Sequence, residues 1–179
     1  MHEATERGET WVYLLITLGH VASDREDYGR AIELLEESLA LSREMGHGLG
    51  LAGSVMSLAT VSYQRGDLKR ANELYEESLD LARDTGMQPI LLTALEGYAC
   101  VAGARGEARR AAQLSGAAQA LQEAKGRPRD TDWLAEADAS IYAVRAELGE
   151  EAWEEAWRKG RKMTLEEAAS CALEDAASG

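Results

Sequence analysis

Three histidines and two cysteines are the side chains of this chain best suited to metal binding or nucleophilic catalysis. His2, His20 and His47 are far apart in the sequence, and none lies at ligand spacing from Cys100 or Cys171. Zinc sites draw their ligands from close pairs of such residues. The motifs Gly-x-Ser-x-Gly and His-Glu-x-x-His do not occur, so two common hydrolase arrangements are missing. We predict a protein that is not an enzyme and that holds no metal or cofactor.

Cys100 follows Glu96 by one helical turn. A reactive thiol is one interpretation of this cysteine, and a small packing residue is the other. A neighbouring carboxylate disfavours the thiolate, so we favour packing. Two cysteines make no disulfide framework, and we expect both to remain reduced in a cytoplasmic protein.

Pairs of adjacent glutamates recur along the chain, as at Glu36-Glu37 and Glu76-Glu77. A hydrolase would need two carboxyl groups in one cleft with different pKa values. These pairs instead lie between apolar positions, which is typical of the solvated outer face of a helix. A basic partner that binds this acidic strip is the alternative interpretation.

Charge excludes several classes of partner. The 179 residues carry a formal net charge of −13, and 45% of them are hydrophobic. Negative charge repels phosphate backbones and anionic lipids, and the basic clusters are divided among predicted helix ends. The longest apolar stretch, residues 11–18, is too short to span a bilayer, and no signal peptide precedes it. We predict a cytoplasmic protein that binds neither nucleic acid nor membranes.

A sequence repeat with a period of 40 residues organises the chain. Residues 31–46 and 71–86 are identical at ten of sixteen positions. The same offset relates Ala31 to Ala71 and Ala111, and it relates Gly66-Asp67 to Gly106-Glu107. A third and more diverged copy therefore follows the first two.

Each copy is predicted to be a pair of helices. In the second copy, Val55, Leu58 and Ser62 fall on one face at helical spacing. Gly66 ends this helix, and Asp67 is a good N-cap for the next one. A small alanine near the start of each second helix allows the paired helices to approach closely.

These residues resemble the tetratricopeptide repeat (TPR). Leu18-Gly19 matches the Leu-Gly position of the family's first helix. Ala31 and Ala71 match the small position of its second helix, and Tyr75 matches the aromatic one. The period is longer than is usual, and the family's late proline is absent. The resemblance implies an all-α fold, a right-handed helical solenoid of three helix pairs with a C-terminal helical cap.

The repeat also predicts the domain organisation. Residues 1–10 form an N-terminal lead, which we interpret as a possible remnant of a preceding repeat. Residues 11–126 hold the three helix pairs, and residues 127–179 form the cap. The 40-residue register is lost in this last segment.

The predicted cap has its own apolar anchors and helix starts. Trp133, Trp153 and Trp157 lie within it, and a solenoid end needs such residues to cover its last repeat. Gly149 is expected to stop one helix. The run Thr164-Leu-Glu-Glu167 has the pattern of a capping box for the last one.

Residues 148–168 resemble the extreme C-terminus of large bacterial ATP-dependent regulators. The shared pattern is Leu-Gly-Glu-Glu-Ala, then aromatic residues, then Gly-Arg-Lys-Met-Thr-Leu-Glu-Glu-Ala. Those proteins, many of them LuxR-type transcriptional regulators, join an output module and a STAND-type nucleotide-binding domain to a C-terminal TPR array. No Gly-x-x-x-x-Gly-Lys-Ser/Thr loop occurs here, so we expect a C-terminal fragment or a stand-alone relative.

In TPR proteins the first helix of each pair lines a concave groove that binds extended segments or partner helices. The register of the resemblance places twelve residues of this chain there: Tyr13, Ile16, His20, Ser23, Asp24, Met56, Thr60, Tyr63, Gln64, Thr93, Glu96 and Cys100. The Lys, Arg and Asn residues of the family's carboxylate clamp are absent from these positions, so recognition of an acidic C-terminal tail is not expected. Tyrosine and methionine supply contact area, and histidine and glutamine supply adaptable hydrogen bonds.

The resulting functional prediction is a protein-interaction and scaffold module, the sensor or partner-binding end of a bacterial transcriptional regulator. The expected partner is a protein or peptide in the groove, or the nucleotide-binding domain of the same parent chain. Two alternatives stay open. One is a sensor whose groove holds a small inducer, and the other is a homodimer formed through exposed solenoid ends.

Overall fold

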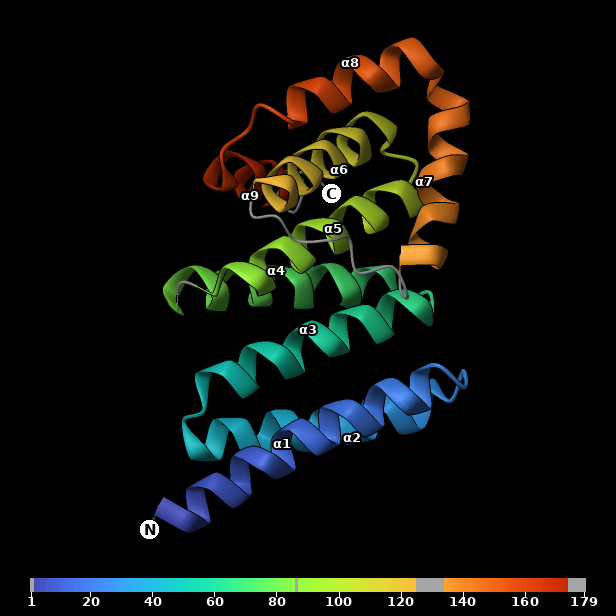
Figure 1. Cartoon of the computed structure of the whole chain (residues 1–179). Helices are drawn as coiled ribbons and strands as arrows, with labels where there is room; N and C mark the ends of the chain where they lie inside the picture. The colour runs from blue at the N-terminus through green and yellow to red at the C-terminus, as the bar shows by residue number, and fades with distance from the viewer. Residues whose placement is uncertain (1, 86, 125–133, 174–179) are drawn as a thin grey trace. The chain divides into compact units, whose positions relative to one another are not determined.

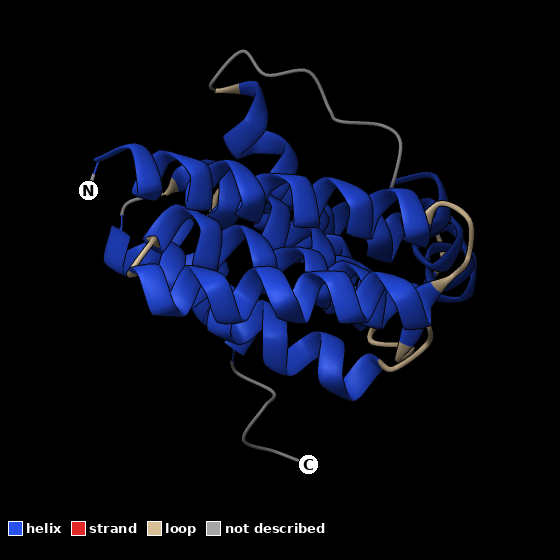
Figure 2. Cartoon of the chain, turned by 90° about the horizontal axis from the view of Figure 1, so that it is seen from below, coloured by secondary structure: helices blue, strands red, loops and turns tan. Residues whose placement is uncertain are grey.

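In the residues that it describes, the computed structural model is built of helices, with short turns between most neighbouring ones (Figures 1 and 2). It describes the backbone of residues 2–85, 87–124 and 134–173, and it describes side chains within residues 8–82, 87, 89–124 and 139–173. In these ranges the helices are α1 (His2–Ser23), α2 (Tyr28–Met45), α3 (Gly48–Gln64), α4 (Leu68–Thr85), α5 (Gln88–Ala104), α6 (Ala108–Glu123), α7 (Leu134–Leu148), α8 (Glu150–Gly160) and α9 (Leu165–Leu173). The described ranges contain no strand, and the all-α prediction is confirmed. None of these helices has the length and hydropathy needed to cross a membrane.

The turn between paired helices has the same geometry in all three copies of the repeat. Glu26, Gly66 and Gly106 stand 40 residues apart, with positive φ angles of 61°, 87° and 78°. The following residue in each copy donates its N–H to the carbonyl five residues earlier, at 2.9–3.0 Å: Asp27, Asp67 and Glu107. This closed turn at a helix C-terminus favours glycine, because only glycine adopts a positive φ without strain. The third copy thus has the same turn as the first two.

Aspartate side chains begin the second helix of the first two pairs. The N–H of Arg30 donates to Asp27 Oδ1 at 3.1 Å, and the N–H of Arg70 donates to Asp67 Oδ1 at 3.1 Å. The N-cap predicted at Asp67 is therefore confirmed.

The chain divides into two compact units, residues 1–91 and residues 92–179. In the first unit, α2 lies beside α1 and α3, and α4 lies beside α3. Its core is made by apolar stripes of α2 and α3: Ala31, Leu35, Leu39, Val55, Leu58 and Val61. Each stripe repeats at helical spacing, so burial of both faces stabilises the unit.

Ser38 ties three helices of the first unit together. Its side chain is fully buried, and its Oγ donates to the carbonyl oxygen of Val12 in α1 at 3.1 Å. The same oxygen lies 2.8 Å from Ser54 Oγ in α3. Buried hydroxyls require such partners, and these bonds fix the register of α1, α2 and α3.

In the second unit, helices that follow the repeat cover α6. The shared core comes from α5, α6, α7 and α8: Ala102, Ala111, Ala112, Val144, Trp153 and Ala156. Trp153 is only 3% exposed, so the predicted role of this tryptophan as an apolar anchor is confirmed. Trp133 lies outside the described residues.

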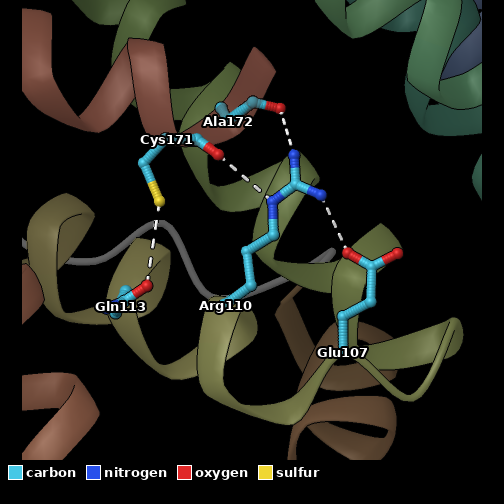
Figure 3. Close-up of polar contacts among 5 residues, drawn as sticks. All are labelled: Glu107, Arg110, Gln113, Cys171 and Ala172. Atoms are coloured by element: carbon cyan, nitrogen blue, oxygen red, sulfur yellow. Dashed lines mark hydrogen bonds and ion pairs between the residues drawn. The ribbon is translucent and has the colours of Figure 1, made fainter. Parts of the chain in front are cut away.

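Arg110 fastens α9 to the start of α6 (Figure 3). Its Nε donates to the carbonyl oxygen of Cys171 at 3.2 Å, and its second terminal nitrogen donates to that of Ala172 at 2.6 Å. The remaining nitrogen pairs with Glu107 at 2.9 Å. A guanidinium group suits the end of a helix because it neutralises unpaired carbonyls there.

The capping box predicted for the last helix is present. Glu167 N–H donates to Thr164 Oγ1 at 3.2 Å, and Thr164 N–H donates to a Glu167 carboxylate oxygen at 2.7 Å. The Thr164 bonds lower the pKa of Glu167. Gly149, with φ 86°, separates α7 from α8 as expected.

Candidate functional site

The twelve predicted groove residues fall into two groups that are described separately. Tyr13, Ile16, His20 and Ser23 lie on α1, with Asp24 directly after it, and Met56, Thr60, Tyr63 and Gln64 lie on α3. All nine belong to the first unit. Thr93, Glu96 and Cys100 lie on α5 in the second unit.

Polar side chains link α1 to α3 within the first unit. Ser23 Oγ donates to Gln64 Oε1 at 2.5 Å, and His20 Nε2 lies 2.9 Å from Ser57 Oγ. A Cβ added to Gly53 would lie 3.5 Å from Ile16 Cδ1, so these two positions also face each other. One side of α1 therefore runs along one side of α3, and both carry predicted groove residues.

Ser57, which is not among the predicted site residues, completes this α1–α3 contact. It lies seven residues before Gln64 on α3, which is two helical turns and therefore the same face. The spacing of seven residues from Gln64 was the feature of the sequence that could have placed Ser57 on this face. The pairing with His20 depends on how α1 meets α3, which no local pattern in the sequence reports.

The His20 side chain stays exposed overall, but its contact with α3 removes part of the solvent around the ring. Loss of solvent around the ring lowers the pKa of His20 from the ordinary 6.5, and the negative charge of Asp24 opposes this effect. The neutral imidazole is therefore favoured, and it can both accept and donate a hydrogen bond.

A serine bonded to a histidine is also the start of a nucleophilic dyad. Here Ser57 is only 5% exposed and lies in the middle of α3. The observed bond joins α1 to α3.

The remaining predicted groove residues of α1 and α3 differ in how exposed their side chains are. Tyr13 is 43% exposed and packs edge-on against His47, with ring centroids 5.8 Å apart. Tyr63 and Gln64 are half-buried. These side chains leave a mixed aromatic and polar surface available to a partner.

Met56 corrects the expectation of contact area on this face. It is only 8% exposed, because α3 contacts helices on several sides and is buried around most of its circumference. Thr60 Oγ1 bonds the Met56 carbonyl oxygen at 3.2 Å and lies 3.4 Å from the Tyr75 hydroxyl. Both residues contribute to packing.

In the second unit the three predicted residues make internal contacts. Cys100 is 2% exposed and its Sγ donates to the carbonyl oxygen of Glu96 at 3.0 Å. The Glu96 carboxylate accepts a 2.5 Å bond from Gln122 of α6. Thr93 is half-buried. Cys100 is therefore a packing residue, as the sequence predicted, and both cysteines are free thiols.

The described side chains include no group of three His, Cys, Asp or Glu residues placed to hold a metal ion. The chemistry available at the α1–α3 face is hydrogen bonding and apolar contact. Such a face can bind a partner molecule.

Comparison with known proteins places this geometry in context. A family model described as tetratricopeptide repeat matches residues 10–84, which span nearly all of α1–α4. Neither the curated proteins nor the solved structures contain a match to the chain. The helix pairs have a TPR-like all-α fold, and the first unit is similar in sequence to the tetratricopeptide-repeat family.

Proposed function

We propose that the α1–α3 face of the first unit binds a protein or peptide partner. TPR repeats generally mediate protein–protein interactions, and the family is typically non-catalytic. The observation that carries the proposal is the match over residues 10–84, because it covers both helices of this face.

The side chains at the face indicate what kind of partner it recognises. Tyr13 offers an exposed aromatic ring, and His20, Tyr63 and Gln64 offer hydrogen-bonding groups. Aromatic residues beside adaptable polar groups are typical of binding hot spots. With no Lys or Arg among the predicted positions, the preferred partner is a segment with mixed apolar and amide character.

Selection of random peptides on the full chain tests this proposal. Enriched peptides are expected to lose at least about five-fold in affinity on His20→Ala and Tyr63→Ala, since hot-spot truncation costs on the order of 1 kcal/mol or more. Glu33→Gln, an exposed change on α2, is the matched control and should leave binding unchanged. Peptides that bind all three variants equally would place the interaction elsewhere.

We further propose that the chain acts as the C-terminal helical-repeat part of a cytoplasmic bacterial regulator of the STAND type. The pattern in residues 148–168 supports this context, and its partner would then be the regulator's nucleotide-binding domain. Residues 11–126 form the repeat array and residues 127–179 its cap. Sequencing the gene upstream of Met1 is the test, and a reading frame without a nucleotide-binding domain would contradict this context.

A further inference from the structure

The outer side of α1 carries a continuous apolar stripe. Trp11, Leu14, Leu18 and Val21 are 50%, 46%, 49% and 41% exposed. Their spacing of three, four and three residues places all four on one face of the helix. Single exposed leucines are ordinary, but an aligned row of four large apolar side chains marks an interaction surface.

Charge is also absent from this part of α1. No Asp, Glu, Lys or Arg occurs between Glu9 and Asp24, in a chain of which 28% of residues are charged. The exposed side of α2, by contrast, carries charged residues such as Arg30 and Glu33. Interface centres are depleted of charge in this way.

The repeat shows which kind of element covers such a stripe. Forty residues later, the equivalent positions on α3 are Leu51, Ser54, Leu58 and Val61. Leu58 and Val61 belong to one core cluster with Ala31, Leu35 and Leu39 of α2, and Leu51 packs against that cluster. Ser54 Oγ lies 2.8 Å from Ser38 of α2. The α3 stripe therefore lies in the core that α3 shares with α2, the second helix of the preceding pair.

We propose that the stripe of Trp11, Leu14, Leu18 and Val21 is a docking site for one amphipathic helix of the α2 kind. The α2 face that covers α3 presents Ala31, Leu35 and Leu39, a small residue followed by leucines at intervals of four. The partner helix presents the same pattern. Opposite Leu14 it carries a small apolar residue, because Leu14 is larger than the Ser54 that meets Ser38.

This surface is distinct from the α1–α3 face of the proposed function. Ile16, His20 and Ser23 meet α3 from α1, whereas the stripe residues remain exposed. Loss of one binding activity therefore leaves the other measurable.

The test attaches a helix of this kind to the N-terminal end of α1, through the same connection that joins α2 to α3. Residues 1–7 are replaced by a copy of residues 27–47 carrying Ser38→Ala, so that the copy runs into Gly8 as His47 runs into Gly48. We expect the melting midpoint to rise by at least about 3 °C. Amide hydrogen exchange within residues 10–21 should slow about ten-fold, since docking suppresses local opening.

Matched controls decide whether the stripe is responsible. The same extension with Leu35→Glu and Leu39→Glu in the copy, and the extended chain with Leu18→Glu on α1, should both lose the stabilisation. Equal midpoints and exchange rates in all three proteins would overturn the proposal. Sedimentation of the unextended chain gives the other contrary outcome, because a dimer dissociated by Leu18→Glu would show that a second copy occupies the stripe.

Discussion

Gly160 of α8 lies directly against the main chain of Gln113 in α6. A Cβ added to the glycine would overlap the Gln113 carbonyl oxygen and lie 2.6 Å from its carbonyl carbon. Gly116 stands in the same relation to the Trp157 carbonyl on α8. The two helices therefore cross at a pair of glycines, one on each helix, and side chains at either position would push them apart.

We expect Gly160→Ala to lower the free energy of unfolding by about 1–3 kcal/mol, because the backbone it meets can only yield by separating α6 from α8. Gly53→Ala is the matched control, since the nearest neighbour of its Cβ would be Ile16 Cδ1 at an ordinary 3.5 Å. That change should stabilise α3 by roughly 0.5–1 kcal/mol. Urea denaturation of both variants checks the prediction, and equal effects would contradict the close crossing.

Glu26 occupies a turn position that glycine occupies in the other two copies. Its φ of 61° is left-handed, which costs an L-residue roughly 1–2 kcal/mol. Glu26→Gly should raise the melting midpoint, with part of the gain lost to the greater freedom of glycine in the unfolded chain. The reverse change at the equivalent turn, Gly66→Glu, should lower it. If the melting midpoint of Glu26→Gly falls instead, the Glu26 side chain stabilises the fold by more than its left-handed backbone conformation costs.

Met56 and Tyr63 are expected to respond differently to truncation, although both belong to the predicted groove. Met56 is 8% exposed, so Met56→Ala should cost about 2–5 kcal/mol of stability. Tyr63 is half-buried, and Tyr63→Ala should cost less while weakening peptide binding. Thermal melts and binding titrations on the two variants separate these roles, and a Met56→Ala protein as stable as the unmodified chain would contradict its burial.

His20 should make stability depend on pH below neutrality. Partial loss of solvent around the exposed His20 side chain lowers the pKa of folded His20 from its ordinary 6.5, so the unfolded chain takes up the proton at a higher pH than the folded chain does. The contribution of His20 is fully present above about pH 6.5 and is lost as the pH falls through the lower pKa of the folded state.

His20→Gln removes this titration while keeping a side chain able to bond Ser57. Urea denaturation at pH 8 and pH 5.5 is the measurement, and the unmodified chain should lose more stability on acidification than His20→Gln loses. Carboxylates titrate in both proteins and largely cancel in the difference. A larger loss in His20→Gln would reverse the sign of the inferred effect.

Local chemistry explains which structural features were predictable from the sequence. Gly66 indicates a turn and Asp67 indicates a helix N-cap, because the backbone angle of the turn and the hydrogen bond of the cap involve only neighbouring residues. The capping box at Thr164 is of the same kind. The period of 40 residues then extends these local features to the third copy, where the amino-acid identities have diverged.

Features that depend on how helices meet were not predictable in this way. Arg110 bonds carbonyls about sixty residues further along the chain, and a cluster of arginines near a helix end does not reveal which of them does so. The α6–α8 crossing is similar, although a glycine inside a helix, such as Gly116, is a sign of close packing. Met56 is a predicted groove residue and yet is only 8% exposed, because a helix buried on most sides has no single outer face.

The final prediction concerns the segment after Gly126, which we propose caps the repeat array. Ala111 and Ala112 of α6 share their core with Trp153 and Ala156 of α8. Ion pairing between Glu123 and Arg161, at 2.7 Å, adds a further link between α6 and the segment. A fully buried large side chain contributes ~1.5–3 kcal/mol, whereas a domain has only ~5–15 kcal/mol of net stability.

A chain ending at Gly126 should therefore unfold at a lower temperature and self-associate, because the uncovered side of α6 becomes an apolar patch. A chain ending at Leu173 keeps α7, α8 and α9 and is the matched control, expected to behave as the full chain does. Calorimetry gives the midpoints, and light scattering gives the oligomeric state. A truncated chain that stays monomeric and melts at the same temperature as the control would show that the segment does not stabilise the repeats. The α5–α6 pair would then be equally stable without Trp153 in the shared core.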